Sequence, residues 1–216
     1  CDISSVKGSV IVKDFSKEKF KMNLKSNKVN VIKILPGGVV TAKDTAEIEL
    51  DANGEFVRNP EVDLVKVAVV ERHQGTGNVA CGFLKGYGIK EGAVALSVAH
   101  DSHNIIVVGV NDEEMEFAVN SLIEQEGGIV LVKEGKVIES MPMPIAGLMS
   151  DQSGEWVDQK LTDIHEKAYE ELGICGDVEP VMTLCFMSLA VIPEIKLTDM
   201  GLFDVTTFSF IPVEVE

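Results

Sequence analysis

Residues 94–110 read Val94-Ala95-Leu96-Ser97-Val98-Ala99-His100-Asp101-Ser102-His103-Asn104-Ile105-Ile106-Val107-Val108-Gly109-Val110, two apolar runs around five polar residues. The runs 94–99 and 105–110 are short and rich in β-branched residues, a pattern typical of buried strands. The polar residues between them are therefore expected at a strand end, against a core. This segment, His100–Asn104, carries two imidazoles, a carboxylate, a hydroxyl and an amide, and we call it the histidine loop.

Similar apolar runs recur along most of the chain. Further strands are expected at 10–12, 20–22, 29–35, 39–40, 46–50, 64–70, 79–84, 129–132, 137–141, 181–186 and 203–213. Glycine-rich turns at 36–38 and 51–54 separate the early strands from one another.

Two helices interrupt the strands. The first is predicted after Asn111, whose side chain can accept a hydrogen bond from the opening turn while Glu114 reaches back. The second is predicted between Ser153, as its cap, and Gly173. Apolar residues recur at helical spacing: Met115, Ala118, Val119, Leu122 and Ile123 in the first helix and Val157, Leu161, Ile164, Ala168 and Leu172 in the second. Each helix is expected to pack one face onto the sheet.

These elements predict an α+β fold with a mixed, largely antiparallel sheet and two main helices. Residues 1–60 are rich in short strands and are expected to form a small β layer that precedes the main domain. Residues 61–216 are expected to form that main domain. The boundary rests on the shift in composition at 58–61.

Composition and charge narrow the range of partners. The chain has 216 residues, of which 45% are hydrophobic and 25% charged, as is ordinary for a soluble globular protein. Its formal net charge of −16 argues against binding to nucleic acid or to anionic lipid. The longest apolar window, 181–195, is too short to span a membrane and contains Pro193. No membrane span is expected.

The cysteines indicate a reducing compartment. Cys1, Cys81, Cys175 and Cys185 are widely spaced and match no disulfide or metal-binding pattern. Reduced thiols in the cytoplasm are the simplest interpretation. Because the chain begins at Cys1 rather than at methionine, we expect it to be part of a longer polypeptide.

The histidine loop has three interpretations. Two imidazoles and a carboxylate suit Zn, Mn or Fe, and His73 could add a third nitrogen to those of His100 and His103. The loop could instead face a substrate, or it could be a polar turn that caps strand ends. The spacing leaves these open, because His100 and His103 point to opposite faces of a strand but to the same side of a tight turn.

Two other polar motifs are weaker signals. The segment Gly75-Thr76-Gly77-Asn78 is favoured as a hairpin turn over an anion site, because it lacks the dinucleotide-binding and P-loop motifs. A nucleophilic Ser97 or Ser102 is not expected, since neither lies in a nucleophile elbow.

Charged residues also interrupt two apolar segments. Glu194, Lys196 and Asp199 either form a partly buried salt bridge or supply a site carboxylate. His165 lies beside the apolar stripe of the second helix and is expected at the boundary of the core rather than as a ligand.

Several segments resemble the C-terminal region of adenine deaminase, in the expected order. The matching segments are Val69–His73, Gly75–Asn78, Gly82–Gly88, Ser97–Asn104, Pro144–Ser150 and Val191–Asp199. The resemblance extends from about Val29 to Val205. It implies a metal-dependent amidohydrolase that hydrolyses adenine to hypoxanthine and ammonia, with Mn or Fe in a TIM-barrel site.

The chain departs from the complete pattern of that family. It has no HxH motif at a strand end, only four histidines, and no eightfold alternation of strands and helices. It also lacks the H-x-E and P-C-x-x-C motifs of the other zinc deaminases. The barrel and its metal ligands are therefore expected outside this chain, which is expected to bind no metal and to be inactive alone.

The resemblance implies a supporting role within the enzyme. The chain would cover the mouth of an amidohydrolase barrel, exclude water and make contacts in a homo-oligomer. The residues expected at the rim of the adenine pocket, or just behind it, are His100, Asp101, Ser102, His103, Asn104, Arg72, His73 and Glu194. The alternative is a non-catalytic domain for oligomerisation or small-molecule binding, motivated by the apolar content and by strands able to pair across an interface.

Overall fold

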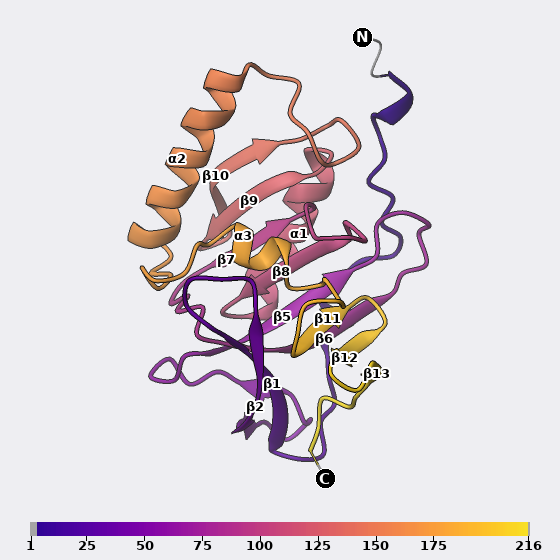
Figure 1. Ribbon diagram of the computed structural model, residues 1–216, viewed down its shortest axis with the longest axis vertical. Helices are drawn as coiled ribbons and strands as arrows, with labels where there is room; N and C mark the ends of the chain where they lie inside the picture. Colours follow the sequence, from indigo (N-terminus) through magenta and orange to yellow (C-terminus); the bar gives the residue numbers. More distant parts are fainter. Residues whose placement is uncertain (1–3, 216) are drawn as a thin grey trace.

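Eight strands form one sheet in the structure, a computed structural model that describes residues 4–215 (Figure 1). They are β1 (Lys28–Ile34), β2 (Thr41–Glu47), β5 (Leu64–Val70), β6 (Val79–Lys85), β7 (Ala93–Leu96), β8 (Ile105–Gly109), β9 (Gly128–Lys133) and β10 (Lys136–Pro142). Their order is β10-β9-β7-β8-β5-β6-β1-β2. All neighbours are antiparallel except β1 and β6, which run parallel. The expected α+β class is confirmed.

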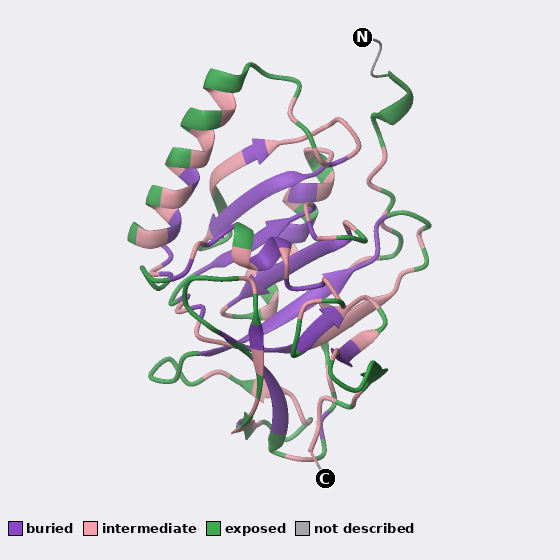
Figure 2. Ribbon diagram, in the orientation of Figure 1, coloured by how far each residue is buried: buried purple, intermediate pink, exposed green. Residues whose placement is uncertain are grey.

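Both faces of this sheet are buried. On β7, Val94 and Leu96 enter the core beneath α2 (Gly154–Glu170) and α3 (Met182–Cys185), whereas Ala93 and Ala95 enter the core beneath α1 (Asp112–Glu124). Figure 2 shows the central strands as one buried layer. Burial on both faces explains why the central strands read as continuous apolar runs rather than as alternating ones.

The two main helices begin where the sequence predicts. The side-chain oxygen of Asn111 accepts from the N–H of Glu114 at 2.8 Å, and that of Ser153 accepts from the N–H of Trp156 at 3.3 Å. Glu114 does not reach back to Asn111. Its carboxylate accepts instead from the N–H of Gly135, at 3.0 Å, in the turn between β9 and β10. Within residues 4–215, no helix is long and apolar enough to cross a membrane.

The first sixty residues differ from the expected separate layer. β1 and β2 extend the edge of the main sheet, and only β3 (Glu49–Leu50) and β4 (Phe56–Val57) form a two-stranded sheet of their own. The segments 10–12, 20–22 and 39–40 are not strands. Val10, Val12 and Phe20 cover the α1 core instead, because apolar side chains can fill a core without a strand ladder. Two short 3-10 helices, η1 (Ser4–Val6) and η2 (Lys17–Phe20), lie in this part. The domain boundary near residue 60 stays a prediction.

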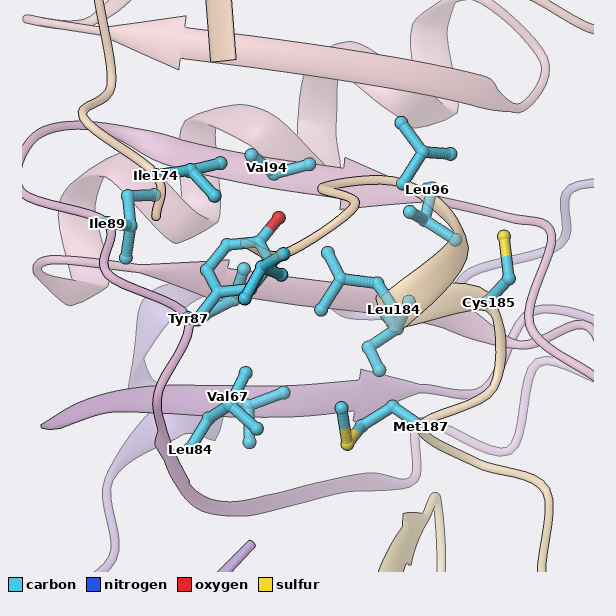
Figure 3. Packing of buried hydrophobic residues seen from close by; sticks show 14 of the residues in the cluster. Val67, Leu84, Tyr87, Ile89, Val94, Leu96, Ile174, Leu184, Cys185 and Met187 are labelled. Carbon is cyan, nitrogen blue, oxygen red and sulfur yellow. The ribbon is translucent and has the colours of Figure 1, made fainter. Parts of the chain in front are cut away.

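The last third also differs from expectation. Residues 181–186 form α3 and turns rather than a strand, and Leu184, Cys185 and Met187 join the same buried cluster as Tyr87 (Figure 3). The Tyr87 hydroxyl donates to the carbonyl of Pro180 at 2.7 Å, which holds this segment on the sheet. A short apolar run does not distinguish a strand from a buried helical turn. After it, β11 (Ile195–Thr198), β12 (Gly201–Asp204) and β13 (Ser209–Phe210) form a three-stranded sheet.

The described cysteines are all free. Cys175 is exposed, Cys81 is half-buried and Cys185 is buried. Burial raises the pKa of both the Cys81 and the Cys185 thiol to about 12, so these two are neutral at pH 7. Cys1 lies outside the described residues.

Candidate functional site

The histidine loop lies at one end of the main sheet, where β7 ends and β8 begins. The β5–β6 turn, the start of β9 and the end of β10 lie at the same end. The N-terminal segment crosses it as well, because the N–H of Ile11 donates to the carbonyl of Arg72 at 2.8 Å and that of Ala146 donates to the carbonyl of Val6 at 3.0 Å. Segments distant in sequence therefore converge around the loop.

The side chain of Arg72 connects two of these segments. Its side chain is buried, with 1% of the residue exposed. Nε donates to the carbonyl of His103 at 2.5 Å, and Nη2 donates to the carbonyl of Ala146 at 3.1 Å. Its backbone N–H donates to the side-chain oxygen of Asn104 at 3.2 Å. Arg72 therefore holds the backbone of the histidine loop against the 143–149 segment.

The guanidinium of Arg72 has no counter-ion among residues 4–215, and its Nη1 has no hydrogen-bond partner there. Burial lowers the pKa of this group. Gly147 makes the space for it: φ is +70°, and a Cβ at this position would lie 2.7 Å from Nη1. The candidate site thus rests on a buried positive charge.

The rings of His100 and His103 lie together beside Phe186. The centroids of the two imidazoles are 5.2 Å apart in a T-shaped arrangement, and those of His100 and Phe186 are 4.8 Å apart. The N–H of His100 donates to the carbonyl of Cys185 at 2.7 Å, which ties the loop to α3. We call these three side chains the aromatic corner.

The imidazoles of the aromatic corner make no hydrogen bonds within the described part of the chain, and Nδ1 of His103 is buried. Burial lowers the pKa of His103, as do the neighbouring charges of His100 and Arg72, so this ring is neutral at pH 7. A neutral imidazole offers one donor and one acceptor.

The other residues predicted at the rim separate into two groups. His73 is exposed and its Nε2 lies 2.7 Å from the carbonyl of Ser102, while the side chains of Asp101 and Ser102 face solvent at the tip of the loop. Glu194 is not brought to the loop: it is exposed, and its carboxylate accepts from the N–H of Lys43 at 2.8 Å, between β2 and β11.

Of the two interpretations of Glu194, Lys196 and Asp199, the salt bridge is wrong for Lys196. Lys196 is fully buried, and its Nζ donates to the carbonyl of Val39 at 2.9 Å rather than to Glu194 or Asp199. Burial lowers the pKa of this amine to about 8. His165, by contrast, lies at the boundary of the core as expected, where its ring contacts Glu179.

Ser97 has a structural role at the site, whereas Phe186 is an additional member of it. The buried Ser97 hydroxyl donates to the carbonyl of Gly147 at 2.6 Å and accepts from the N–H of Gly128 at 2.7 Å, so it holds two segments together. Phe186 was missed by the sequence analysis, because it lies in the run predicted as a strand. An aromatic residue in that run was the only available signal.

The three histidines do not form a ligand set. No group of three or more His, Cys, Asp or Glu side chains in the described part of the chain is arranged to hold a metal ion. Nε2 of His73 is directed at the carbonyl of Ser102 rather than toward His100 and His103. The described residues therefore do not form the metal site that the pattern of imidazoles left open at His73, His100 and His103.

The glycine-rich β5–β6 turn does bind an anion, and that anion is the carboxylate of Glu71 from the same turn. The carboxylate of Glu71 accepts from the N–H groups of His73, Gln74 and Thr76 at 2.5, 2.8 and 2.9 Å, and from the Thr76 hydroxyl at 3.0 Å. Burial would raise the pKa of Glu71, but these hydrogen bonds outweigh it and lower the pKa to about 2. The hairpin interpretation is confirmed, and Glu71 fills the anion-binding geometry.

The Glu71 contacts predict a dependence of stability on pH. In the unfolded chain, Glu71 takes up a proton at its ordinary pKa of 4.5. In the folded protein, its carboxylate keeps its charge below that pH, down to about 2. Stability should therefore fall as the pH drops from about 4.5 to about 2. We expect Glu71→Gln to lower the free energy of unfolding by about 2 kcal/mol at pH 7 and by much less near pH 2. Urea titrations at both pH values measure this, and an equal loss at both would contradict it.

Comparison with known proteins identifies the family of this chain. A model of the family described as the adenine deaminase C-terminal domain matches residues 38–209. Adenine deaminase 2 of Desulfotalea psychrophila is 68% identical over 213 residues, which are 99% of this chain and 37% of that protein. Adenine deaminase of Ligilactobacillus salivarius is 49% identical over 99% of this chain and 37% of its own length. The chain thus spans little more than a third of the relatives it matches, and it belongs to the adenine deaminase C-terminal domain family.

Proposed function

We propose that the complete protein is a metal-dependent adenine deaminase, a hydrolase that converts adenine to hypoxanthine and ammonia, and that this chain closes its active site. One observation carries the proposal: the rings of His100 and His103 lie together at the end of the sheet that holds the buried Arg72, and Nδ1 of His103 is buried without a hydrogen-bond partner among the described residues. Polar groups that are shielded yet unpaired are uncommon in folded proteins, and they favour a role in binding or catalysis. The reaction itself is suggested by the names of the relatives.

The aromatic corner suits the purine that the reaction requires. Adenine donates from its amine and accepts at its ring nitrogens, and His103 would offer one such contact through Nε2, since its Nδ1 is buried. Phe186 would form an apolar wall that excludes water from the reacting groups, and the ring of His100, which packs against it, would offer a second polar contact. Arg72 acts on the loop backbone, so we assign it a positioning role rather than contact with substrate.

The metal of this enzyme is proposed to lie in an amidohydrolase barrel formed by the remainder of the polypeptide. Mn or Fe would activate water there. The further context is a cytoplasmic homo-oligomer that acts in adenine catabolism and purine salvage. The free thiols of Cys81, Cys175 and Cys185 support a reducing compartment.

The test is alanine substitution in the complete enzyme. We expect His100→Ala and His103→Ala each to lower kcat/KM for adenine about 100-fold or more, the range typical of a lost general acid–base or orienting group. His165→Ala is the matched control, because His165 lies on α2 and contacts Glu179 away from the loop. Its rate should equal that of the wild type.

Two outcomes would contradict the proposal. Wild-type rates in both loop variants would remove the histidine loop from the active site. A comparable loss in His165→Ala would mean that any lost imidazole damages the enzyme as a whole. Far-UV circular dichroism of each variant shows whether the fold is retained.

A further inference from the structure

The three-stranded sheet carries exposed apolar side chains, one of which contacts the β5–β6 turn beside the candidate site. Met200, Phe208 and Phe210 are 67%, 73% and 55% exposed. Met200 lies on the β11–β12 turn, Phe208 just before β13 and Phe210 on β13. We call these three side chains the hairpin patch. Figure 2 shows β13 as an exposed segment beside buried β12 strand residues. Exposed aromatic groups that gather in this way mark interaction surfaces more often than scattered single residues do.

The two phenylalanines of the patch are fixed by a third. The ring of Phe203, which is buried on β12, lies 5.2 Å from those of Phe208 and Phe210, at interplanar angles of 85° and 78°. A Cβ on Gly201 would lie 3.7 Å from the Phe210 ring, so the residue after Met200 borders the same aromatic group. The patch therefore has one defined arrangement.

The turn that presents Phe208 is also well ordered by hydrogen bonds. The carboxylate of Asp204 accepts from the N–H and hydroxyl of Thr206 at 2.9 and 2.6 Å and from the N–H of Thr207 at 3.2 Å. Its other oxygen pairs with Lys43 at 2.9 Å. Aromatic anchors held in place before binding lose little conformational entropy when a partner covers them.

Met200 connects the patch to the end of the sheet that holds the histidine loop. The side-chain amide of Asn78 lies 3.4 Å from the sulfur of Met200, and Asn78 closes the turn that contains His73. A domain that met the histidine loop would therefore meet this surface too. The relatives carry almost two thirds of their length outside the matched region, which provides such a domain.

We propose that the hairpin patch is the docking surface for the remainder of the same polypeptide, with Phe208 and Phe210 as its anchors. This inference rests on the proposed function, because it takes the remainder to contain the active site that the histidine loop closes. The occupant is expected to offer an apolar pocket, since the patch consists of two benzyl groups and a thioether.

The experiment uses calorimetry of the complete enzyme. A docked domain unfolds together with the rest, so the wild type should show a single transition. In Phe208→Ser with Phe210→Ser, a transition for this domain should separate and lie about 5 °C or more below the main one. Phe117→Ser is the matched control: Phe117 is 37% exposed on α1, on the opposite face of the sheet, and its variant should keep one transition.

A second variant guards against simple misfolding. Phe208→Tyr with Phe210→Tyr keeps the ring contacts with Phe203 but would bury two hydroxyls in the interface. It should show the same separation to a smaller degree. If only the serine variant changes, the effect comes from lost packing inside the domain and the proposal is overturned.

The other outcomes are equally decisive. Two transitions in the wild type, or one unchanged transition in both variants, would overturn the docking surface. A variant that keeps one transition but has half the mass of the wild type by light scattering would assign the patch to a second copy instead. Activity is measured separately from docking. If His100→Ala is inactive but the Phe208 and Phe210 variants keep one unchanged transition, only the proposed function is supported. If the transitions of those variants separate but the histidine-loop variants are fully active, only the docking surface is supported.

Discussion

Gly128→Ala is expected to unfold the domain. Gly128 begins β9 with φ at +109°, and a Cβ there would lie 1.9 Å from the carbonyl oxygen of Met141 and 2.9 Å from the nitrogen of Met143. Both atoms belong to the backbone of the paired strand and its continuation, so no side-chain rotation can relieve the clash. We expect a loss of about 5 kcal/mol or more, which equals the whole stability of many domains. Far-UV circular dichroism during urea unfolding measures it.

Gly135→Ala is the matched control for this prediction. Gly135 also has a left-handed backbone, with φ at +66°, but nothing lies within 4 Å of the added Cβ. It should cost about 1 kcal/mol, from backbone strain alone. If the two substitutions destabilised the protein equally, the close approach of β9 and β10 at Gly128 would be refuted as the cause.

Arg72→Lys is expected to have the second largest effect. Lysine keeps the buried charge, so the cost of desolvation stays, but a single ammonium cannot reproduce the fork that donates to the carbonyls of His103 and Ala146. At least one carbonyl then lacks its donor. We expect a loss of about 2–4 kcal/mol in the free energy of unfolding. In the complete enzyme, kcat should fall as well, since the histidine loop loses its support.

Arg58→Lys provides the comparison, because these are the only two arginines in the chain. Arg58 is half-buried, and its Nη2 makes one hydrogen bond, to the carbonyl of Ile89 at 3.0 Å. Lysine can replace that single donor, so the loss should stay near 1 kcal/mol or below. Equal losses at both positions would show that the forked contact of Arg72 contributes nothing special.

The sequence predicts the elements around the histidine loop well because their signals are local. The apolar runs around it form β7 and β8, and the caps Asn111 and Ser153 begin their helices as expected. Each of these signals depends only on residues that are close in sequence, within one or two helical turns or within a strand. Local patterns of this kind identify an element without knowledge of its neighbours.

The contacts that make the site are not local, and they could not be predicted. Arg72 lies 31 residues before His103 and 74 before Ala146, so nothing near it in sequence indicates that it donates to both. The parallel pairing of β1 with β6 and the short helix at Met182–Cys185 likewise depend on what the rest of the chain leaves uncovered. Phe186 enters the aromatic corner only because that helix forms.

Gly127 and Gly147 limit how this end of the molecule can change over evolutionary time. A Cβ on Gly127 would lie 2.6 Å from the Cα of Gly147 and 2.9 Å from the Ser97 hydroxyl, so neither backbone can move without the other. Substitutions at either glycine should therefore cost folding stability, because an added Cβ would displace the neighbouring segment. Substitutions at the exposed tip, Asp101 and Ser102, should disturb the fold far less, because their side chains face solvent.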